Sequence, residues 1–316
     1  MAQFNISYLP QQQIDKTKWD NCINGSSNGL IYARSYYLDI TAPGWNALVL
    51  NDYEAVMPLP TRKKWIFSYL FEPPMTPILG VFGNQVSGTL VNAFLQAIPA
   101  AIRFWDYSLN HYNPVSPGIY PAYTRNNFVL PLGHTYEHLE KKYNENTRRN
   151  IRKAIKMGCV VRNIAVDEVI AICRKEFPKF TRVSPNLFDQ VKNIFLHPGH
   201  RSAVYGVENA EGELLASAAF LFCNRRAYYW LVGNNPGNRP YSASSLLIDS
   251  FIRDYQGQPL LLDFEGSDQP GIADFYKKFG GQPEPFTTIY YNKLPIPFKW
   301  YKKPPAHYQL SNGNTA

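Results

Sequence analysis

The stretch Asp263–Gly281, DFEGSDQPGIADFYKKFGG, is the most informative part of the sequence for the fold. It predicts a strand that ends at Glu265, a turn that contains Pro270, and a short helix that Gly280 and Gly281 terminate. Four residues recur at the spacing of one helical face: Ile272, Phe275, Tyr276 and Phe279. By this spacing Tyr276 is a core aromatic residue, but its hydroxyl leaves a second role open, that of a proton donor.

The two halves of the chain repeat one order of elements around this stretch. Each half predicts two strands, a basic turn, an aromatic strand, a helix and two further strands. The basic turns are Arg62–Lys64 and Arg225–Arg226, and Asp106 and Asp263 hold the same relative strand position. We therefore predict an α/β (α+β) chain with two tandem copies of one unit, each a mixed, mostly antiparallel sheet flanked by helices.

Composition excludes several classes of protein. The 316 residues are 45% hydrophobic and 18% charged, which is typical of globular domains. No apolar run approaches the roughly 20 residues that span a bilayer, and no secretion signal is visible, so we expect a cytoplasmic protein with membrane contact at most peripheral. The cysteines are far apart and predict free thiols in a reducing compartment: Cys22, Cys159, Cys173 and Cys223.

A basic helix is expected between the halves, at residues 147–157, with Asn146 or Thr147 as its cap. Ile151, Ala154 and Ile155 form its expected apolar stripe. Like charges four residues apart repel each other, so a docked anion would stabilise this helix. We assign anion or substrate binding to Arg148, Arg149 and Arg152, with an ordinary solvated helix as the alternative. The formal net charge of +8 agrees with an anionic partner, although it also agrees with simple solubility.

The helix predicted within Asp263–Gly281 resembles a helix of a known superfamily. ADFYKKFGG resembles the final helix of the GNAT acyltransferases, in which a tyrosine often protonates the departing thiolate of coenzyme A. Tyr276 occupies that place. The superfamily also has a basic residue followed by small residues that cradle a pyrophosphate, and RPYSAS at residues 239–244 matches this spacing. The resemblance thus implies a donor-binding segment made of Arg239, Tyr241, Ser242, Ala243 and Ser244. Serines at 242 and 244 depart from the usual glycine or alanine and narrow the room for a pyrophosphate.

The tandem order together with NENTRRNIRKAIKMG resembles the Fem-type aminoacyltransferases, which build peptidoglycan cross-bridges from two GNAT-like units. The resemblance covers about residues 30 to 300 and is better from Thr135 to Lys293. It implies a first unit at residues 1–134 for the acceptor or for structure, and a second unit at 135–305 for transfer. We expect residues 306–316 to be a disordered tail. The long helical arm that some members use for tRNA is not evident here.

Acyl transfer to an amine requires three roles. We place the amide groups that polarise the donor carbonyl at Leu231, Val232 and Gly233, where a strand end splays. Glu265 is the predicted base and Tyr276 the predicted acid. No tightly bound cofactor and no metal is expected, since His197 and His200 flank a Pro-Gly turn without a third ligand in sequence reach.

The expected activity is therefore N-acyl transfer from a co-substrate, either acyl-CoA or aminoacyl-tRNA, to an amine on a small molecule or a cell-wall precursor. The alternative is a non-catalytic tandem module that binds a nucleotide-linked or RNA ligand. The sequence does not specify the oligomeric state.

Overall fold

The computed structural model describes residues 4–116, 118–179, 184, 186–266, 268 and 270–303. The chain divides into two compact units. Unit 1 contains the residues up to Arg125 and those from Pro285 onward, and unit 2 contains Asn126–Glu284. These bounds differ from the halves expected from sequence, because the last strand returns to unit 1. The predicted tail at 306–316 lies outside the described residues.

Unit 1 contains two groups of strands. The first is antiparallel, in the order β1 (Ile6–Pro10), β2 (Asn46–Leu50), β3 (Ala55–Leu59) and β6 (Phe82–Gly83). The second joins β4 (Thr61–Lys64), β5 (Phe67–Leu70), β7 (Ile102–Ser108) and β14 (Gln282–Asn292), and among the described pairs β5 and β7 run parallel. The first three residues of β14, Gln282 to Glu284, belong to unit 2. The basic run Arg62–Lys64 was expected to be a turn; it forms β4, because Lys64 pairs with Phe67 across a two-residue turn.

The helices of unit 1 are short. They are α1 (Lys16–Gly25), α2 (Ser35–Thr41), α3 (Gly88–Ala97) and α10 (Phe298–Tyr301), with 3-10 turns at Gln11–Gln13 and Ile31–Ala33. Ser87 caps α3, since its hydroxyl accepts a hydrogen bond from the amide of Leu90. The core beneath them is strongly aromatic, with the rings of Trp19 and Trp45 packed edge to face at 4.7 Å.

Unit 2 is built on one mixed sheet. Its strands follow the order β8 (Ala122–Pro131), β13 (Leu261–Asp263), β12 (Arg226–Asn234), β11 (Leu214–Cys223), β10 (Arg201–Glu208) and β9 (Val160–Asn163). Only β12 and β13 pair in parallel. The mixed, mostly antiparallel sheet with flanking helices confirms the predicted fold class.

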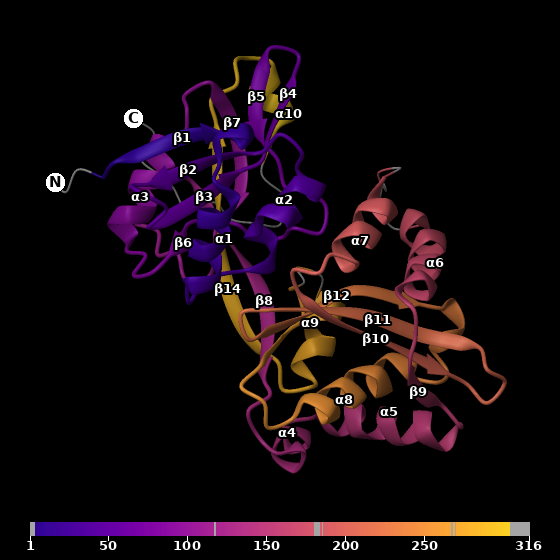
Figure 1. Ribbon diagram of the computed structural model, residues 1–316. Coiled ribbons are helices and arrows are strands. Elements are labelled where there is room, and N and C mark those ends of the chain that lie inside the picture. The colour runs from indigo at the N-terminus through magenta and orange to yellow at the C-terminus, as the bar shows by residue number, and fades with distance from the viewer. Residues whose placement is uncertain are drawn as a thin grey trace. The chain divides into compact units, whose positions relative to one another are not determined.

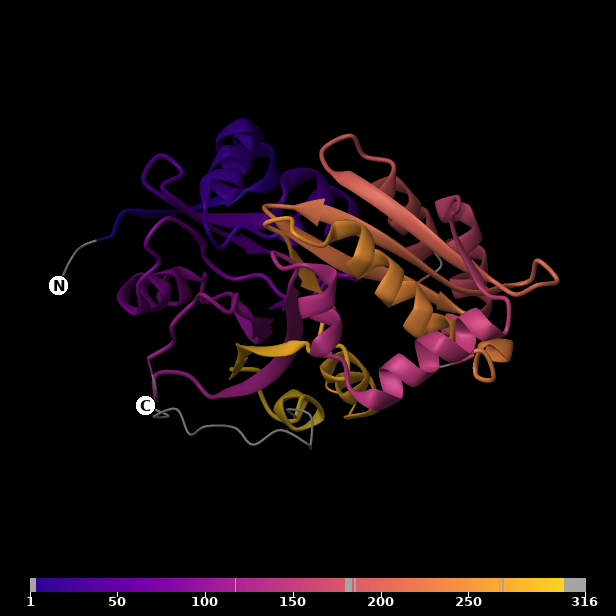
Figure 2. The same cartoon turned by 90° about the horizontal axis from the view of Figure 1, so that it is seen from below.

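Helices cover both faces of this sheet (Figures 1 and 2). On one face, α6 (Val166–Glu176) packs on β11 and β12 beside α7 (Leu187–Phe195). On the other, α8 (Ala243–Tyr255) packs on β10 and β11 and lies along α5 (Glu145–Lys156). Shorter elements complete the unit: α4 (Tyr136–Lys141), α9 (Pro270–Lys277) and the 3-10 turns Phe177–Lys179 and Pro236–Asn238.

Two local expectations for unit 2 need correction. The hairpin turn after β11 uses only Asn224 and Arg225, both with positive φ as a tight hairpin requires, so Arg226 begins β12 and is buried. The basic helix starts at Glu145, because Asn144 is the cap and its side chain accepts the amide of Thr147. Its buried face is Thr147, Ile151 and Ala154, whereas Ile155 is 58% exposed.

Candidate functional site

The strands β12 and β13 separate after a short paired segment. They pair only from Arg226 with Leu261 to Tyr228 with Asp263. β12 then follows β11 as far as Asn234, whereas the amide of Phe264 bonds to the carbonyl of Phe128 on β8. The register of β11 against β12 shifts at Ala219/Phe220, so Trp230 is an extra residue that bends β12 at this point. Sequence reasoning expected β13 to continue to Glu265, but its last residue is Asp263.

A cavity of about 610 Å³ lies where the strands part. Residues from four regions of unit 2 line it: Glu176, Phe177, Tyr229, Val232, Asn234, Ser244, Gly271, Ile272, Phe275 and Tyr276. They come from the end of α6 and the turn after it, the far half of β12, the first turn of α8 and most of α9. The cavity is therefore mostly apolar, with a few polar groups that converge on it, which is typical of a small-molecule site.

Tyr276 is a buried residue in the wall of this cavity. Its ring stacks on Phe264, with centroids 4.5 Å apart, and meets the ring of Tyr229 edge to face at 6.4 Å. Burial raises the pKa of the Tyr276 phenol above its ordinary value, and the carboxylates of Glu265 and Asp263 raise it further. The phenol therefore keeps its proton at neutral pH and can donate it but not act as a base.

Glu265 lies in the turn that follows β13. It is half-buried, its φ is +60°, and its amide donates to Asp263 Oδ1 at 2.7 Å. Among the described residues that line the cavity, Glu265 does not occur. The predicted base is thus near enough to Tyr276 to influence its pKa, but it does not face the same space.

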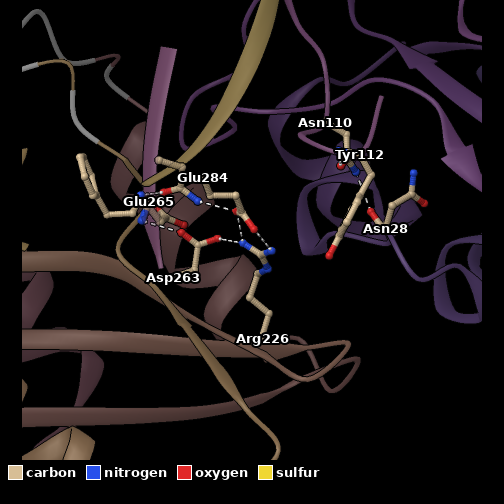
Figure 3. A network of polar contacts seen from close by, with 9 residues as sticks. Asn28, Asn110, Tyr112, Arg226, Asp263, Glu265 and Glu284 are labelled. Carbon is tan, nitrogen blue, oxygen red and sulfur yellow. Dashed lines mark hydrogen bonds and ion pairs between the residues drawn. The ribbon is translucent and has the colours of Figure 1, made fainter. Parts of the chain in front are cut away.

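A buried ion network fixes the start of that turn (Figure 3). Arg226 Nη1 contacts Asp263 Oδ2 at 2.6 Å and Glu284 Oε2 at 2.8 Å, and Arg226 Nη2 contacts Glu284 Oε1 at 2.9 Å. Asn127 Nδ2 also donates to Glu284 at 3.1 Å. Asp263 accepts hydrogen bonds from both Arg226 and the amide of Glu265. The network therefore sets the direction in which the chain leaves β13.

Glu176 is a carboxylate of this site that sequence reasoning missed. It ends α6, is only 8% exposed, and lines the cavity. Lys179 Nζ contacts both of its oxygens, at 2.8 and 2.7 Å. Val169, Ile170 and Cys173 form the buried face of α6, and Glu176 follows at the same helical spacing. A carboxylate on this apolar face is the sequence signal that could have identified Glu176. Tyr229 and Asn234 were missed as well, since strand alternation does not distinguish a cavity from a core.

The predicted carbonyl-binding segment lies at the far half of β12. Leu231 and Gly233 are buried, and Val232 lines the cavity. The carbonyl of Val232 accepts a contact from Cys173 Sγ at 3.4 Å. A Cβ on Gly233 would lie 2.8 Å from Ser217 Oγ and 3.1 Å from Ile172, so only glycine lets α6 and β11 pack this closely.

The predicted donor-binding segment surrounds the start of α8. Ser242, at φ +59°, is the helix cap, and Ala243 begins the helix and is buried. Ser244 lines the cavity, and its Oγ donates to Asn234 Oδ1 at 2.8 Å. Arg239 is exposed and Tyr241 half-buried. The amino end of a 13-residue helix therefore lies at the edge of the cavity, where its dipole favours a negative charge.

The predicted anion site on α5 is separate from this cavity. Arg148 and Arg152 both contact Glu145, at 3.3 and 2.8 Å, and Arg149 donates to Asn146 at 2.7 Å. One carboxylate at the start of the helix thus relieves part of the like-charge repulsion that was the basis for expecting a docked anion.

Two features are absent from the described part of the chain. It contains no group of three His, Cys, Asp or Glu side chains that could hold a metal ion. No helix in it combines the length and the apolar character that crossing a bilayer requires.

Comparison with known proteins finds a match to a family model over most of unit 2. The family model described as an acetyltransferase (GNAT) domain matches residues 141–278. No curated protein sequence matches this chain.

Solved structures share the fold at low sequence identity. FemX superposes with a TM-score of 0.63 at 13% identity, over 90% of this chain and 97% of its own. A tandem GNAT protein from the clavulanic acid biosynthesis pathway gives 0.53 at 11%, over 90% and 98%. The C-terminal domain of a putative lysylphosphatidylglycerol synthetase from Agrobacterium fabrum gives 0.51 at 12%, over 87% and 91%. The chain thus has a Fem-like tandem GNAT fold, as the sequence predicts.

Proposed function

We propose, because residues 141–278 match the model of the GNAT acetyltransferase domain, that this chain moves an acyl or aminoacyl group from an activated donor to an amine. One observation supports the proposal most: Tyr276, whose phenol stays protonated, lines a cavity beside the part of β12 that has left β13. A carbonyl compound that lies along β12 would have its leaving group beside a proton donor.

In the proposed reaction the amine nitrogen attacks the donor carbonyl and forms the new C–N bond. The bond to the leaving atom breaks, and the Tyr276 hydroxyl protonates that atom, a thiolate sulfur or a ribose oxygen. Peptide groups at Leu231–Gly233 would stabilise the negative charge on the carbonyl oxygen. The amine must also lose a proton, which one carboxylate accepts.

Two carboxylates are candidates for that base. Sequence reasoning favours Glu265, which follows β13. We favour Glu176, because this residue lines the cavity and Lys179 contacts both of its carboxylate oxygens. Glu265 then acts on Tyr276 through its charge.

The donor is proposed to carry phosphate groups, because the amino end of α8 lies at the cavity edge. Acyl-CoA and aminoacyl-tRNA both satisfy this condition. The likeness in fold to FemX supports an amine on a cell-wall precursor as the acceptor, with a small-molecule amine as the second choice. A tandem module that only binds a nucleotide-linked ligand is the competing proposal, and turnover separates the two.

The test is transfer by the Tyr276→Phe variant. Acetyl-CoA and alanyl-tRNA are offered as donors to a panel of amines, and product is detected by mass spectrometry. Loss of the general acid should lower kcat by about 10²–10⁴-fold, while the thermal shift caused by the donor stays unchanged. Tyr255→Phe removes a hydroxyl from α8 outside the cavity lining and serves as the matched control.

The base is identified in the same assay. Glu176→Gln should lose about 10²–10⁴-fold in kcat and Glu265→Gln much less; the reverse order would return the role of base to Glu265. Donor binding without turnover under every condition would favour the binding module.

A further inference from the structure

Unit 1 presents a face that the proposed chemistry does not use. It is made of residues 61–70, which form the hairpin β4–β5, and residues 293–303, which include α10; we call it the hairpin–α10 face (Figure 1). Four large apolar residues on it are strongly exposed: Trp65 at 68%, Ile66 at 79%, Ile296 at 66% and Trp300 at 64%. Exposed apolar residues gathered in one place mark interaction surfaces.

The exposed rings are held by packing. The ring of Phe298 on α10 packs against the rings of Trp65 and Phe67, with centroid distances of 5.2 and 5.4 Å. Asn292 Nδ2, at the end of β14, donates to the carbonyls of Lys302 at 2.9 Å and Lys299 at 3.3 Å. Trp65 itself lies in the two-residue hairpin turn with φ +54°, a conformation that suits glycine or asparagine better than a bulky residue. The chain thus places a tryptophan at the tip in spite of a backbone cost.

Behind the tip lies a second cavity, of about 490 Å³. Its walls are mainly aromatic and aliphatic: Trp65, Phe67, Tyr69, Phe104, Leu294 and Phe298. Lys64 and Lys302 complete the lining, and their ammonium groups lie 5.6 Å from the Trp65 ring and 5.4 Å from the Phe104 ring. The cavity therefore combines room for hydrocarbon with two fixed cations.

The charge of the face has one sign. Its two segments contain seven basic residues and no aspartate or glutamate: Arg62, Lys63, Lys64, Lys293, Lys299, Lys302 and Lys303. Basic side chains around exposed tryptophan and isoleucine match the two layers of an anionic lipid surface, whose phosphates attract lysine and whose interface favours tryptophan.

We propose that the hairpin–α10 face docks on a bilayer that contains acidic phospholipid, with Trp65, Ile66, Ile296 and Trp300 in the lipid interface and the cavity taking up hydrocarbon. Single-stranded nucleic acid is the main alternative for an aromatic and basic face, because bases stack on such rings. Lipid is favoured because Ile66 and Ile296, two of the four strongly exposed apolar residues of the face, offer a base no ring on which to stack.

The inference is independent of the acyl-transfer site, which belongs to unit 2. It would stand if the proposed chemistry failed, and its own failure would leave the chemistry untouched.

Co-sedimentation with vesicles tests the proposal, using phosphatidylcholine alone and phosphatidylcholine mixed with phosphatidylglycerol. The full chain should sediment with the mixed vesicles and not with phosphatidylcholine alone, and added salt should release it. Each lysine at an anionic surface contributes a factor of about five to partitioning, so Lys64→Ala should weaken binding about fivefold. Lys153→Ala on α5 is the matched control and should bind as the parent does.

A second variant tests the apolar part of the face. Trp65→Ser/Ile66→Ser should lose vesicle binding by at least about tenfold, since it removes two large side chains from the interface. Val160→Ser/Leu196→Ser removes exposed apolar side chains of unit 2 and should change nothing. Tryptophan emission gives an independent readout: Trp65 and Trp300 are exposed and the other four tryptophans are buried, so a blue shift on adding mixed vesicles reports on the hairpin–α10 face.

The proposal is overturned if the chain ignores mixed vesicles, or if the control pair lowers binding as much as the face variants do. It is also overturned by two results together, with RNA binding followed by the same emission shift. Single-stranded RNA would bind the parent protein and displace it from the vesicles, and the Trp65→Ser/Ile66→Ser variant would no longer bind RNA but would still bind the vesicles.

Discussion

Tyr276 shows how surroundings set the role of a single residue. A phenol has an ordinary pKa of about 10, and here burial first and two nearby carboxylates second push the pKa upward. A raised pKa keeps the proton on the oxygen over a wider range of pH. The residue is thereby suited to protonate a leaving group and unsuited to accept a proton from an amine.

The pH profile of the reaction should reflect this direction. Because the Tyr276 pKa lies above its ordinary value, kcat should not fall between about pH 8 and pH 10 through loss of the phenol proton. The measurement is kcat against pH for the parent and for Tyr276→Phe. A falling limb with an apparent pKa below about 9 that disappears in the variant would contradict the assignment.

The residue spacing in Asp263–Gly281 predicts the place of Tyr276, but it does not predict all the other residues of the cavity. Ile272, Phe275 and Tyr276 do line one space, as their shared helical face indicates. Periodicity places Glu176 on the buried stripe of α6, but it does not show that this position lines a cavity. That follows only from the packing of α6 on β12. The sequence predicts Glu265 at the end of β13, but the strand ends at Asp263, so Glu265 lies in the turn that follows.

At the scale of elements, the Arg226 network joins three strands. Arg226 begins β12, Asp263 ends β13 and Glu284 lies in β14, and all three side chains are largely buried. A buried charge is costly without partners, so the arginine and its two carboxylates depend on each other.

Replacing Arg226 by methionine should therefore be strongly destabilising. The change leaves two buried carboxylates without their cation, and the free energy of unfolding should fall by about 3–5 kcal/mol in urea denaturation. Arg225→Met, one residue earlier in the exposed turn, should stay within about 0.5 kcal/mol of the parent. Equal losses in the two variants would show that the network contributes little.

The elements themselves were predictable where the pattern is local. Alternation and apolar runs predict the two strands that open each half, and these strands are β2, β3, β10 and β11. The basic run Arg62–Lys64 was misassigned because charge is typical of turns, whereas an edge strand tolerates it. The bend at Trp230 had no signal, because a bulge depends on how β11 and β12 pair.

The whole molecule has four cysteines, and all of them are free thiols. Cys159 and Cys173 are buried, and Cys22 and Cys223 are half-buried. Burial raises the pKa of Cys173 to about 12, so the fraction of reactive thiolate there is very small near neutral pH.

Alkylation of the native protein should follow this order. Iodoacetamide at about pH 8 should modify Cys173 last, and in urea all four thiols should react at similar rates, because unfolding returns each pKa to about 8.5. Peptide mass spectrometry at timed intervals gives the four rates. Early modification of Cys173 in the native protein would mean that α6 opens away from β12.

The division of the chain has a consequence during its synthesis. β7 pairs with β5, which precedes it, and with β14, whose pairing residues Thr288–Asn292 follow all of unit 2 in the chain. At roughly 5–20 residues per second, the edge of β7 that pairs with β14 stays unpaired for on the order of ten seconds while unit 2 is translated. Unit 2 can therefore mature first, and the nascent amino-terminal segment is the part that a chaperone would have to shield.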